Sequence, residues 1–147
     1  MSGMDKKVGF IGAGNMATAL IKGIISSGLY NPQMINAYDN DPHKLKTIYA
    51  EYSVNGLSSN SELIKSCNII ILAVKPQVMN AVLEEIKAST TKNHVVISIA
   101  AGIKIKTIQS FLGQDVPVIR VMPNTPALIQ RGVSFAAAGE ADRKSVV

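Results

Sequence analysis

Aromatic side chains are scarce in this sequence, and their scarcity limits how the core can be built. Phe, Trp and Tyr account for 5% of the 147 residues and there is no Trp, whereas hydrophobic residues account for 47%. The core must therefore consist mainly of Ile, Val, Leu, Ala and Met, which suits a parallel sheet covered by helices. The length allows one domain with a well-buried core, and the hydrophobic content argues against disorder.

Cysteine and histidine are also rare. Cys67 is the single cysteine, so no internal disulfide can form and a reducing cytoplasm suits the chain. Cys67 has no evident catalytic partner, and we expect a buried structural thiol rather than a nucleophile. His43 and His94 lack the spacing of metal ligands and are expected at the surface. We predict no metal site, and the sequence shows no paired catalytic carboxylates and no nucleophile motif.

Long apolar runs and clustered charges of one sign are missing as well. No stretch approaches the roughly 20 apolar residues of a membrane span. The run Val8–Ile11 follows two lysines, but Gly12 and Gly14 interrupt it too soon for a signal peptide. The net charge of +5 is scattered, without the basic stripe and interleaved aromatics of a nucleic-acid platform. We therefore predict neither a membrane nor a nucleic-acid partner.

The sequence does contain a regular alternation of short apolar runs with segments of helical periodicity. Extended runs are predicted at residues 8–11, 34–38, 54, 69–74, 95–99, 118–122 and, at an edge, 132–138. Helices are predicted from residue 17, from residue 42, near 62–65, from residue 76 and over 105–112. Strands that alternate with helices imply right-handed βαβ crossovers. The predicted fold class is α/β, a Rossmann-type doubly wound and mostly parallel sheet in one domain spanning residues 1–147.

Periodicity also assigns the inward faces of two helices. In the second helix, the residues expected to face the core are Leu45, Ile48, Tyr49 and Tyr52. In the helix that begins at residue 76, the expected set is Val78, Met79, Val82, Leu83 and Ile86. Each set falls on one side of a helix with 3.6 residues per turn.

The most informative pattern is a glycine-rich loop at residues 12–17, Gly-Ala-Gly-Asn-Met-Ala, between a predicted strand and a predicted helix. Gly12 permits a tight turn, Gly14 leaves room for a pyrophosphate against the backbone, and Ala17 lets the helix pack closely on the sheet. The amino end of the helix offers free N–H groups and the positive end of its dipole to phosphates. The alternative is a glycine turn in another α/β protein, but the flanking strand and helix favour a dinucleotide-binding domain.

Asp39 ends the second predicted strand, where an acid can accept hydrogen bonds from the ribose hydroxyls of adenosine. A carboxylate at this position favours NAD and repels the 2′-phosphate of NADP. The alternative is a turn residue, because the stretch Asp39-Asn-Asp-Pro42 is rich in turn formers.

Three further segments, residues 73–76, 98–102 and 122–126, follow predicted strands at the edge where open α/β sheets bind ligands. Lys75 could meet a phosphate, a hydroxyl or a carboxamide, or it could be a solvated surface lysine. Small residues, Ala100 and Ala101 among them, would let a flat nicotinamide ring lie against the backbone. Asn124, between two prolines, could hold a fixed amide or form a plain turn.

Four of these stretches together match one known family. They are Val8-Gly-Phe-Ile-Gly-Ala-Gly-Asn-Met16, Ala73-Val-Lys-Pro76, Ser98-Ile-Ala-Ala-Gly102 and Arg120-Val-Met-Pro-Asn-Thr-Pro-Ala127. With them the chain resembles, nearly end to end, the N-terminal domain of pyrroline-5-carboxylate reductase. The last stretch is the most specific, because many dehydrogenases share the glycine loop.

The resemblance implies a reaction and a cofactor. NAD(P)H would give a hydride to the imine carbon C5 of 1-pyrroline-5-carboxylate and make L-proline, a step of amino-acid biosynthesis. The residues that it implies for cofactor contact are Ile11, Gly12, Ala13, Gly14, Asn15, Met16, Ala73, Val74, Lys75 and Pro76. It also implies that Asn60 lies near the adenosine end and Ala101 near the nicotinamide, and that the full-length protein is a homo-oligomer.

Two features depart from the family. Many members carry Ser, Thr, Asn or Arg where Asp39 stands and favour NADPH, so Asp39 leaves the choice between NADPH and NADH open. The helical C-terminal domain, which in the family forms the dimer and most of the substrate pocket, is expected to be absent from this chain, and no catalytic residue is assigned. Two other interpretations stay open: a β-hydroxyacid dehydrogenase with a similar glycine-rich opening, and a stand-alone nucleotide-binding module without catalysis.

Overall fold

A parallel sheet of six strands forms the centre of the computed structural model, which describes residues 6–121. The strands are β1 (Val8–Ile11), β2 (Ile35–Tyr38), β3 (Asn55–Gly56), β4 (Ile69–Leu72), β5 (Val95–Ser98) and β6 (Val118–Arg120). They follow the order β3-β2-β1-β4-β5-β6, and every neighbouring pair is parallel. This is the strand order of a Rossmann sheet, and it confirms the predicted fold class.

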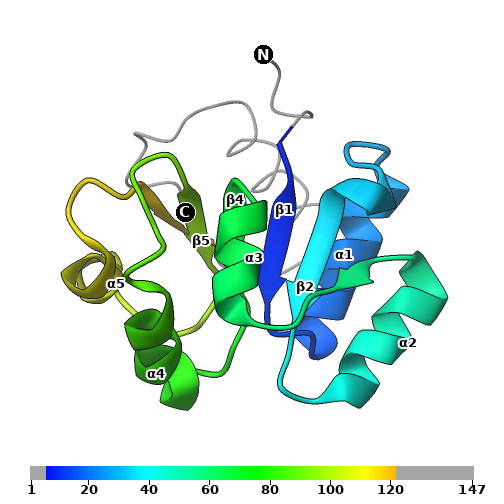
Figure 1. The fold of residues 1–147 in the computed structure, drawn as a ribbon, viewed down its shortest axis with the longest axis horizontal. Coiled ribbons are helices and arrows are strands. Elements are labelled where there is room, and N and C mark those ends of the chain that lie inside the picture. Colours follow the sequence, from blue (N-terminus) through cyan, green and yellow to red (C-terminus); the bar gives the residue numbers. More distant parts are fainter. Residues whose placement is uncertain (1–5, 122–147) are drawn as a thin grey trace.

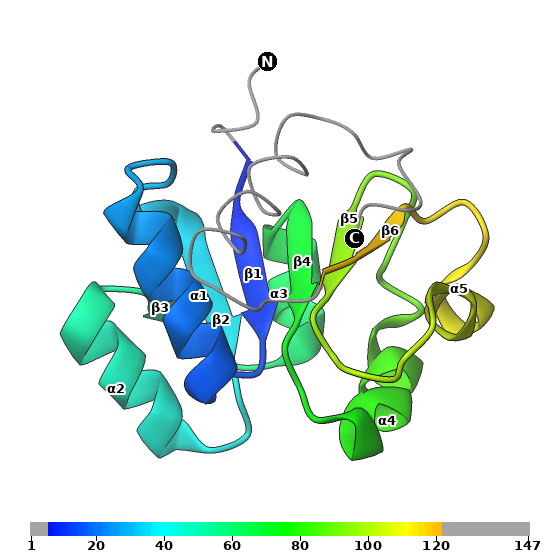
Figure 2. The ribbon, with the colours of Figure 1, turned by 180° about the vertical axis from the view of Figure 1, so that it is seen from behind.

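Helices cover both faces of the sheet (Figures 1 and 2). They are α1 (Asn15–Ser26), α2 (Pro42–Tyr52), α3 (Asn60–Ser66), α4 (Pro76–Ile86) and α5 (Ile105–Leu112), with a short 3-10 turn, η2 (Pro32–Met34), before β2. Helices α1 and α2 contribute to one core cluster, and α3, α4 and α5 contribute to the other. The chain is therefore wound on both sides of the sheet, as the alternation of runs predicted.

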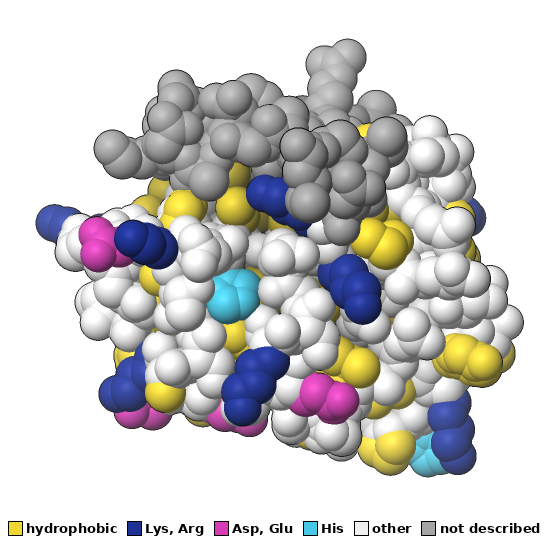
Figure 3. Space-filling model, turned by 45° about the horizontal axis from the view of Figure 1, so that its top comes forward, with side chains coloured by type: hydrophobic (Ala, Val, Ile, Leu, Met, Phe, Trp, Pro, Cys, Tyr) yellow, Lys and Arg dark blue, Asp and Glu magenta, His cyan; other side chains and the backbone are white. Residues whose placement is uncertain are grey.

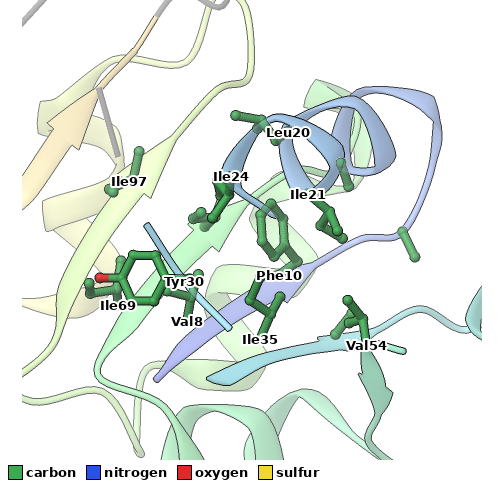
Figure 4. Packing of buried hydrophobic residues seen from close by; sticks show 14 of the residues in the cluster. Val8, Phe10, Leu20, Ile21, Ile24, Tyr30, Ile35, Val54, Ile69 and Ile97 are labelled. Carbon is green, nitrogen blue, oxygen red and sulfur yellow. The ribbon is translucent and has the colours of Figure 1, made fainter. Parts of the chain in front are cut away.

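The core divides at the sheet because alternate residues of a strand face opposite sides. In β4, Ile69 and Ile71 belong to the cluster with α1, whereas Ile70 and Leu72 belong to the cluster with α3, α4 and α5. All four are fully buried, which explains why this strand is apolar at every position. Figure 4 shows Phe10 of β1 packed among the aliphatic side chains of the first cluster.

Gly9 in β1 brings α3 close to the sheet. A methyl group at this position would lie 2.6 Å from Cδ2 of Leu63 and 2.8 Å from Sγ of Cys67. Both distances are well inside an ordinary van der Waals contact, so α3 packs against β1 as it does because residue 9 has no side chain. The sequence pattern did not single out Gly9, because a glycine within an apolar run does not show that a helix packs closely against it.

Strand β1 has its predicted bounds and β3 begins one residue after the extended position predicted at 54, whereas β2, β4, β5 and β6 are each shorter at one end than predicted. Strand β2 begins at Ile35 because Met34 closes the turn η2. Strands β4, β5 and β6 end at Leu72, Ser98 and Arg120, so residues 73 and 74 belong to the connection into α4. The predicted strand at 132–138 lies outside the described residues.

Two residues predicted to face the core are exposed instead. Tyr49 of α2 and Val78 of α4 leave 61% and 45% of their surface accessible, so these two predictions are wrong. Successive side chains of an α-helix are rotated by about 100° from one another. The fully buried residues Ile48 and Met79, next to Tyr49 and Val78 in the sequence, lie at the centre of the contact that each helix makes. Tyr49 and Val78 lie one position away from that centre, beyond the narrow line along which each helix meets the sheet.

Cys67 and the two histidines have distinct environments. Cys67 is buried, and burial raises the pKa of its thiol to about 11, which confirms the expected structural thiol. His43 is exposed, as predicted. His94 is more than a surface residue, because its Nδ1 accepts the N–H of Thr91 at 3.0 Å and its Nε2 lies 2.8 Å from the carbonyl oxygen of Ile64. His94 therefore ties the turn before β5 to the end of α3.

Metal-binding and membrane-spanning features are not found in the described part of the chain. Within residues 6–121, no three His, Cys, Asp or Glu side chains gather closely enough to hold a metal ion. No helix in the same range is long and apolar enough to cross a membrane. On the face drawn in Figure 3, the Lys and Arg side chains lie at scattered places rather than in one stripe.

Candidate functional site

The loops that follow the parallel strands meet at one edge of the sheet, the lower edge in Figure 1. After β1 the chain runs outward to β2 and β3, and it then returns to β4 on the other side of β1. The connections therefore diverge between β1 and β4. This divergence is the switch point at which open α/β sheets bind ligands, and the glycine loop between β1 and α1 lies there.

Gly12 is required by the backbone. Its φ is +104°, a conformation that residues with a side chain rarely adopt, and a methyl group on it would lie 2.7 Å from the carbonyl oxygen of Ala73. The N–H of Gly12 donates to the carbonyl oxygen of Tyr38 at 2.8 Å, and the N–H of Ala73 donates to that of Ile11 at 2.9 Å. The predicted tight turn is confirmed, and it is closed on one side by β2 and on the other by the segment after β4.

Gly14 is in a different situation. Its φ of −83° is open to any residue, and no heavy atom lies within 4 Å of the place where its side chain would be. Nothing in the described protein therefore requires glycine here, and the space in front of residue 14 is open. Ala17, one turn into α1, is fully buried and belongs to the core cluster beneath that helix, as the predicted close packing requires.

The first turn of α1 presents unused hydrogen-bond donors. Gly14 is the N-cap residue and makes no side-chain cap, while its carbonyl oxygen accepts the N–H and the hydroxyl of Thr18. Among residues 6–121, no acceptor meets the N–H groups of Gly14, Asn15, Met16 and Ala17. Asn15 and Met16 are exposed. Such a helix terminus, with its positive dipole end, favours an anion.

Asp39 holds the glycine loop. Its Oδ2 accepts the N–H of Ala13 at 2.9 Å, and its Oδ1 accepts the N–H of Asp41 at 2.8 Å. The second bond is the local turn that the sequence offered as an alternative. The first bond was not predicted, because it joins residues 26 positions apart. The ribose contact of Asp39 stays a prediction.

The segment after β4 lies beside the glycine loop. Cγ1 of Val74 would lie 3.2 Å from a methyl group on Gly12, next to the carbonyl of Ala73. Lys75 is the N-cap residue of α4, and Pro76 occupies its first turn. Lys75 is exposed and makes no ion pair with any residue in the described range. Its ammonium group is therefore available to an anion at the edge that carries the glycine loop.

Asn60 opens α3 on the same edge and is buried, with 5% of its surface accessible. Its Nδ2 donates to Oε1 of Glu85 in α4 at 3.0 Å. Its Oδ1 is buried and has no hydrogen-bond partner among the described residues. The family resemblance implied that Asn60 lies near the adenosine end, and Glu85 was missed because its contact with Asn60 depends on how α3 and α4 pack.

Small residues follow β5, as predicted. Ser98 is fully buried, and its Oγ accepts the N–H of Ala100 at 3.3 Å. Ala100 is buried, Ala101 is exposed, and Gly102 has a φ of +78°. This turn leaves a backbone surface without large side chains at the carboxyl end of β5, where a flat ring could lie. Asn124, from the segment after β6, lies outside the described residues.

Arg120 was missed as a candidate and was noted only as part of a sequence stretch. It pairs with Ser98 at the carboxyl end of β6. Its Nε is buried and has no hydrogen-bond partner among the described residues. The position of a charged residue at the end of a predicted strand could have marked Arg120 as a candidate site residue. An arginine next to an apolar run can equally be an ordinary surface residue, so the signal is weak.

The predicted residues form two groups. The glycine loop, Asp39 and residues 73–76 are joined by hydrogen bonds and close contacts around Gly12 and Ala13. Asn60 and Ala101 lie at the same edge, and within residues 6–121 neither of them is hydrogen-bonded to the loop. The open space before Gly14, the unused N–H groups and the exposed Lys75 fit a phosphate-bearing ligand, and the small residues after β5 fit its flat end.

Comparison with known proteins agrees with this arrangement. The family model described as "NADP oxidoreductase coenzyme F420-dependent" matches residues 7–102. The chain is 42% identical over 131 residues to a pyrroline-5-carboxylate reductase of Escherichia coli (strain K12), covering 89% of this chain and 49% of that protein. It is 38% identical over 133 residues to one of Arabidopsis thaliana, covering 90% of this chain and 48% of that protein. The chain thus spans about half the length of the curated relatives it matches.

Solved structures give the same picture. A Plasmodium falciparum pyrroline carboxylate reductase with NADP bound has a TM-score of 0.73 and 32% identity, covering 86% of this chain and 45% of that one. A pyrroline-5-carboxylate reductase from Coxiella burnetii has a TM-score of 0.78 and 28% identity, covering 96% and 58%. A 3-hydroxyisobutyrate dehydrogenase of Mycobacterium tuberculosis, with a TM-score of 0.63 and 14% identity, shares the fold alone.

Proposed function

Because the chain belongs to the family of NADP oxidoreductases described as coenzyme F420-dependent, we propose that it binds NADH or NADPH along the carboxyl edge of its sheet. We further propose that the whole protein uses this cofactor to reduce 1-pyrroline-5-carboxylate to L-proline. The observation that carries the proposal is the glycine loop, which closes on Ala73 through the positive φ of Gly12 and leaves the N–H groups of the next residues unused. The 42% identity to a pyrroline-5-carboxylate reductase supports the proposed substrate.

The pyrophosphate of the cofactor would be held by the backbone at the start of α1. The N–H of Ala13 is already engaged by Asp39, so the donors for phosphate are those that follow it, at Gly14, Asn15 and Met16. The open space in front of Gly14 admits the phosphate without a side chain in its way. Lys75, exposed beside the loop, would add positive charge.

The two ends of the cofactor would lie on either side of the loop. Asp39 at the end of β2 and Asn60 at the start of α3 would meet the adenosine end. Ala100 and Ala101 after β5 would lie against the nicotinamide, which when bound supplies the hydride that the imine carbon accepts. The task of these residues is to hold the ring in one orientation and to exclude water from it.

We propose that most contacts to the substrate come from further chain that corresponds to the half of the relatives which these 147 residues do not match. The same part would join the subunits of a homo-oligomer. We place the protein in the cytoplasm, where its single cysteine stays reduced.

The proposal is tested by assaying the full-length protein for proline formation with NADH and NADPH side by side. Turnover of pyrroline-5-carboxylate, with no turnover of 3-hydroxy acids, is the expected result. Turnover of 3-hydroxy acids instead would favour the dehydrogenase alternative. Dinucleotide binding without turnover of either class would favour a nucleotide-binding module.

A further inference from the structure

The end of β2 holds the glycine loop at two successive N–H groups. The carbonyl oxygen of Tyr38 accepts the N–H of Gly12 at 2.8 Å, and the carboxylate of the next residue, Asp39, accepts the N–H of Ala13 at 2.9 Å. The first bond uses the backbone, so any residue at 38 provides it. The second uses a side chain, and it therefore depends on the residue at position 39.

The bond from Ala13 to Asp39 is one that the loop cannot easily lose. Ala13 is 3% exposed, and a buried N–H without an acceptor costs free energy comparable to a lost hydrogen bond. An ionised acceptor makes the bond shorter and stronger than a neutral one. The other carboxylate oxygen is fixed by the N–H of Asp41 at 2.8 Å, so the carboxyl group is held from both sides.

We propose that Asp39 is a positioning residue for the pyrophosphate of the cofactor, acting through the N–H of Ala13, in addition to any contact with the ribose. This inference rests on the proposed dinucleotide binding. By accepting the N–H of Ala13, Asp39 would fix the orientation of the peptide group before Gly14, and with it the backbone N–H groups of Gly14, Asn15 and Met16 that are offered to the phosphate beside the open space at Gly14. Cofactor choice and phosphate binding are therefore coupled through one carboxylate.

Two simpler roles make different predictions. A residue that only reads the ribose affects every adenosine ligand by the same factor, whether or not the ligand carries a second phosphate. A residue that only shapes the turn before α2 affects stability and leaves the relative affinities of ligands unchanged. A positioning residue acts most on ligands that reach the loop with their second phosphate.

The experiment compares AMP with ADP by calorimetric titration of the purified protein, because the two differ by the phosphate that would meet the loop. Asp39→Ser is expected to lower the ADP-to-AMP ratio of affinities by about fivefold or more, in line with the loss of a hydrogen bond to a charged group. Asp39→Asn, which keeps one carbonyl acceptor for two N–H groups, should give a smaller fall. Asp41→Asn is the matched control: it removes the same charge two residues away, from a side chain that, within residues 6–121, accepts only the N–H of His43.

Amide hydrogen exchange of the wild-type protein gives a second test, which does not depend on whether a variant folds. The N–H of Ala13 should be protected in the free protein and remain so with ADP, whereas those of Gly14, Asn15 and Met16 should gain protection with ADP and less with AMP. An unchanged ADP-to-AMP ratio in folded Asp39→Ser, or fast exchange at Ala13 in the free protein, would overturn the inference. Failure of the wild-type protein to bind NADH, NADPH or ADP would overturn the proposed function instead.

Discussion

The two glycines of the loop after β1 serve different purposes. Gly12 is needed by the protein itself, because its backbone has a positive φ and the carbonyl of Ala73 occupies the place of a side chain. Gly14 has an ordinary φ and open space before it, so a side chain there would meet a ligand rather than the protein. Gly12 thus has a folding role, whereas Gly14 has only the binding role that we propose, and substitutions can distinguish the two.

Gly14→Val is predicted to weaken dinucleotide binding by at least tenfold, which is about 1.4 kcal/mol, because a branched side chain would stand where the phosphate lies. The free energy of unfolding should fall by about 1 kcal/mol or less, since valine is a poorer N-cap residue than glycine. Titration of NADH into the variant measures the effect. A folded variant with wild-type affinity would rule out this position as the phosphate site.

Gly12→Ala is the control for that substitution, and its main effect should be on stability rather than on binding. Its left-handed backbone and the 2.7 Å approach to the Ala73 carbonyl predict a loss of stability of about 2 kcal/mol or more. Thermal unfolding of the two variants should therefore rank Gly12→Ala well below Gly14→Val.

Asp39→Ser is predicted to shift the ratio of affinities toward NADPH by about tenfold, because a carboxylate repels the 2′-phosphate and a serine hydroxyl does not. The affinities for both cofactors are measured in the wild type and the variant, so a general loss of affinity cancels in the ratio. Asp41→Ser removes a neighbouring charge and should leave the ratio as it is. If the ratio does not move in Asp39→Ser, the carboxylate acts on the loop and the turn alone.

At the scale of elements, the contact between α3 and β1 depends on a missing side chain. Leu63 and Cys67 approach Gly9 so closely that a methyl group has no room. His94 then fixes the far end of α3 through the carbonyl oxygen of Ile64. A helix of seven residues has little stability of its own, so these tertiary contacts hold it in place and with it Asn60 at the edge of the sheet.

Gly9→Ala is predicted to lower the free energy of unfolding by about 1–3 kcal/mol, the usual cost of overpacking a core. In a Leu63→Ala background the same change should cost less, because the contacts with Cδ2 and Cγ of Leu63 are then gone and only the contact with Sγ of Cys67 remains. Denaturant unfolding of the four proteins of this double-mutant cycle measures the coupling. Gly56→Ala, where the methyl would lie 3.3 Å from Cβ of Leu45, is a milder control, and equal effects of Gly9→Ala in both backgrounds would contradict the packing argument.

At the scale of the whole molecule, buried acidic groups limit stability at high pH. Burial raises the pKa of Cys67 from its ordinary value of 9.0 to about 11 and that of Tyr30 from 10.0 to about 12. Each group keeps its proton in the folded protein at pH values where the unfolded chain has lost it. The folded state then binds more protons, so stability falls as pH rises.

For Cys67, the contribution is complete below about pH 9 and is lost as the pH rises through about 11. We predict that the stability of Cys67→Ala falls less steeply than that of the wild type between these two pH values. Unfolding by urea across the range, measured on both proteins, gives the difference. Parallel curves would show that the thiol is not the group responsible.

A protein consisting of these 147 residues alone is predicted to bind NADH weakly and to make no proline. Hydride transfer requires the imine carbon within about 3–3.5 Å of the nicotinamide, and we propose that the contacts which hold it there lie outside this chain. Such a protein should also self-associate, because the apolar surface that we propose the rest of the protein covers would be open. Turnover near that of the full-length enzyme would place the substrate site within these residues.

Several features follow from the sequence alone. The alternation of apolar runs with helical periods determined the parallel sheet, since a strand such as Ile69–Leu72 must be buried on both faces to be apolar throughout. The spacing of Gly12, Gly14 and Ala17 between a strand and a helix determined where the loop lies and which glycine closes the turn. These are local properties, which neighbouring residues specify.

Other features were decided by the tertiary structure, because they join residues far apart in the chain. The bond from Ala13 to Asp39, the pairing of Asn60 with Glu85 and the closeness of Gly9 to α3 depend on how helices settle on the sheet. The exposure of Tyr49 and Val78 also depends on packing. Periodicity predicts which side of a helix faces the core, but not the width of the buried contact on that side. Packing alone determines that width, and packing alone lets Asp39, which also forms the local turn, hold the glycine loop.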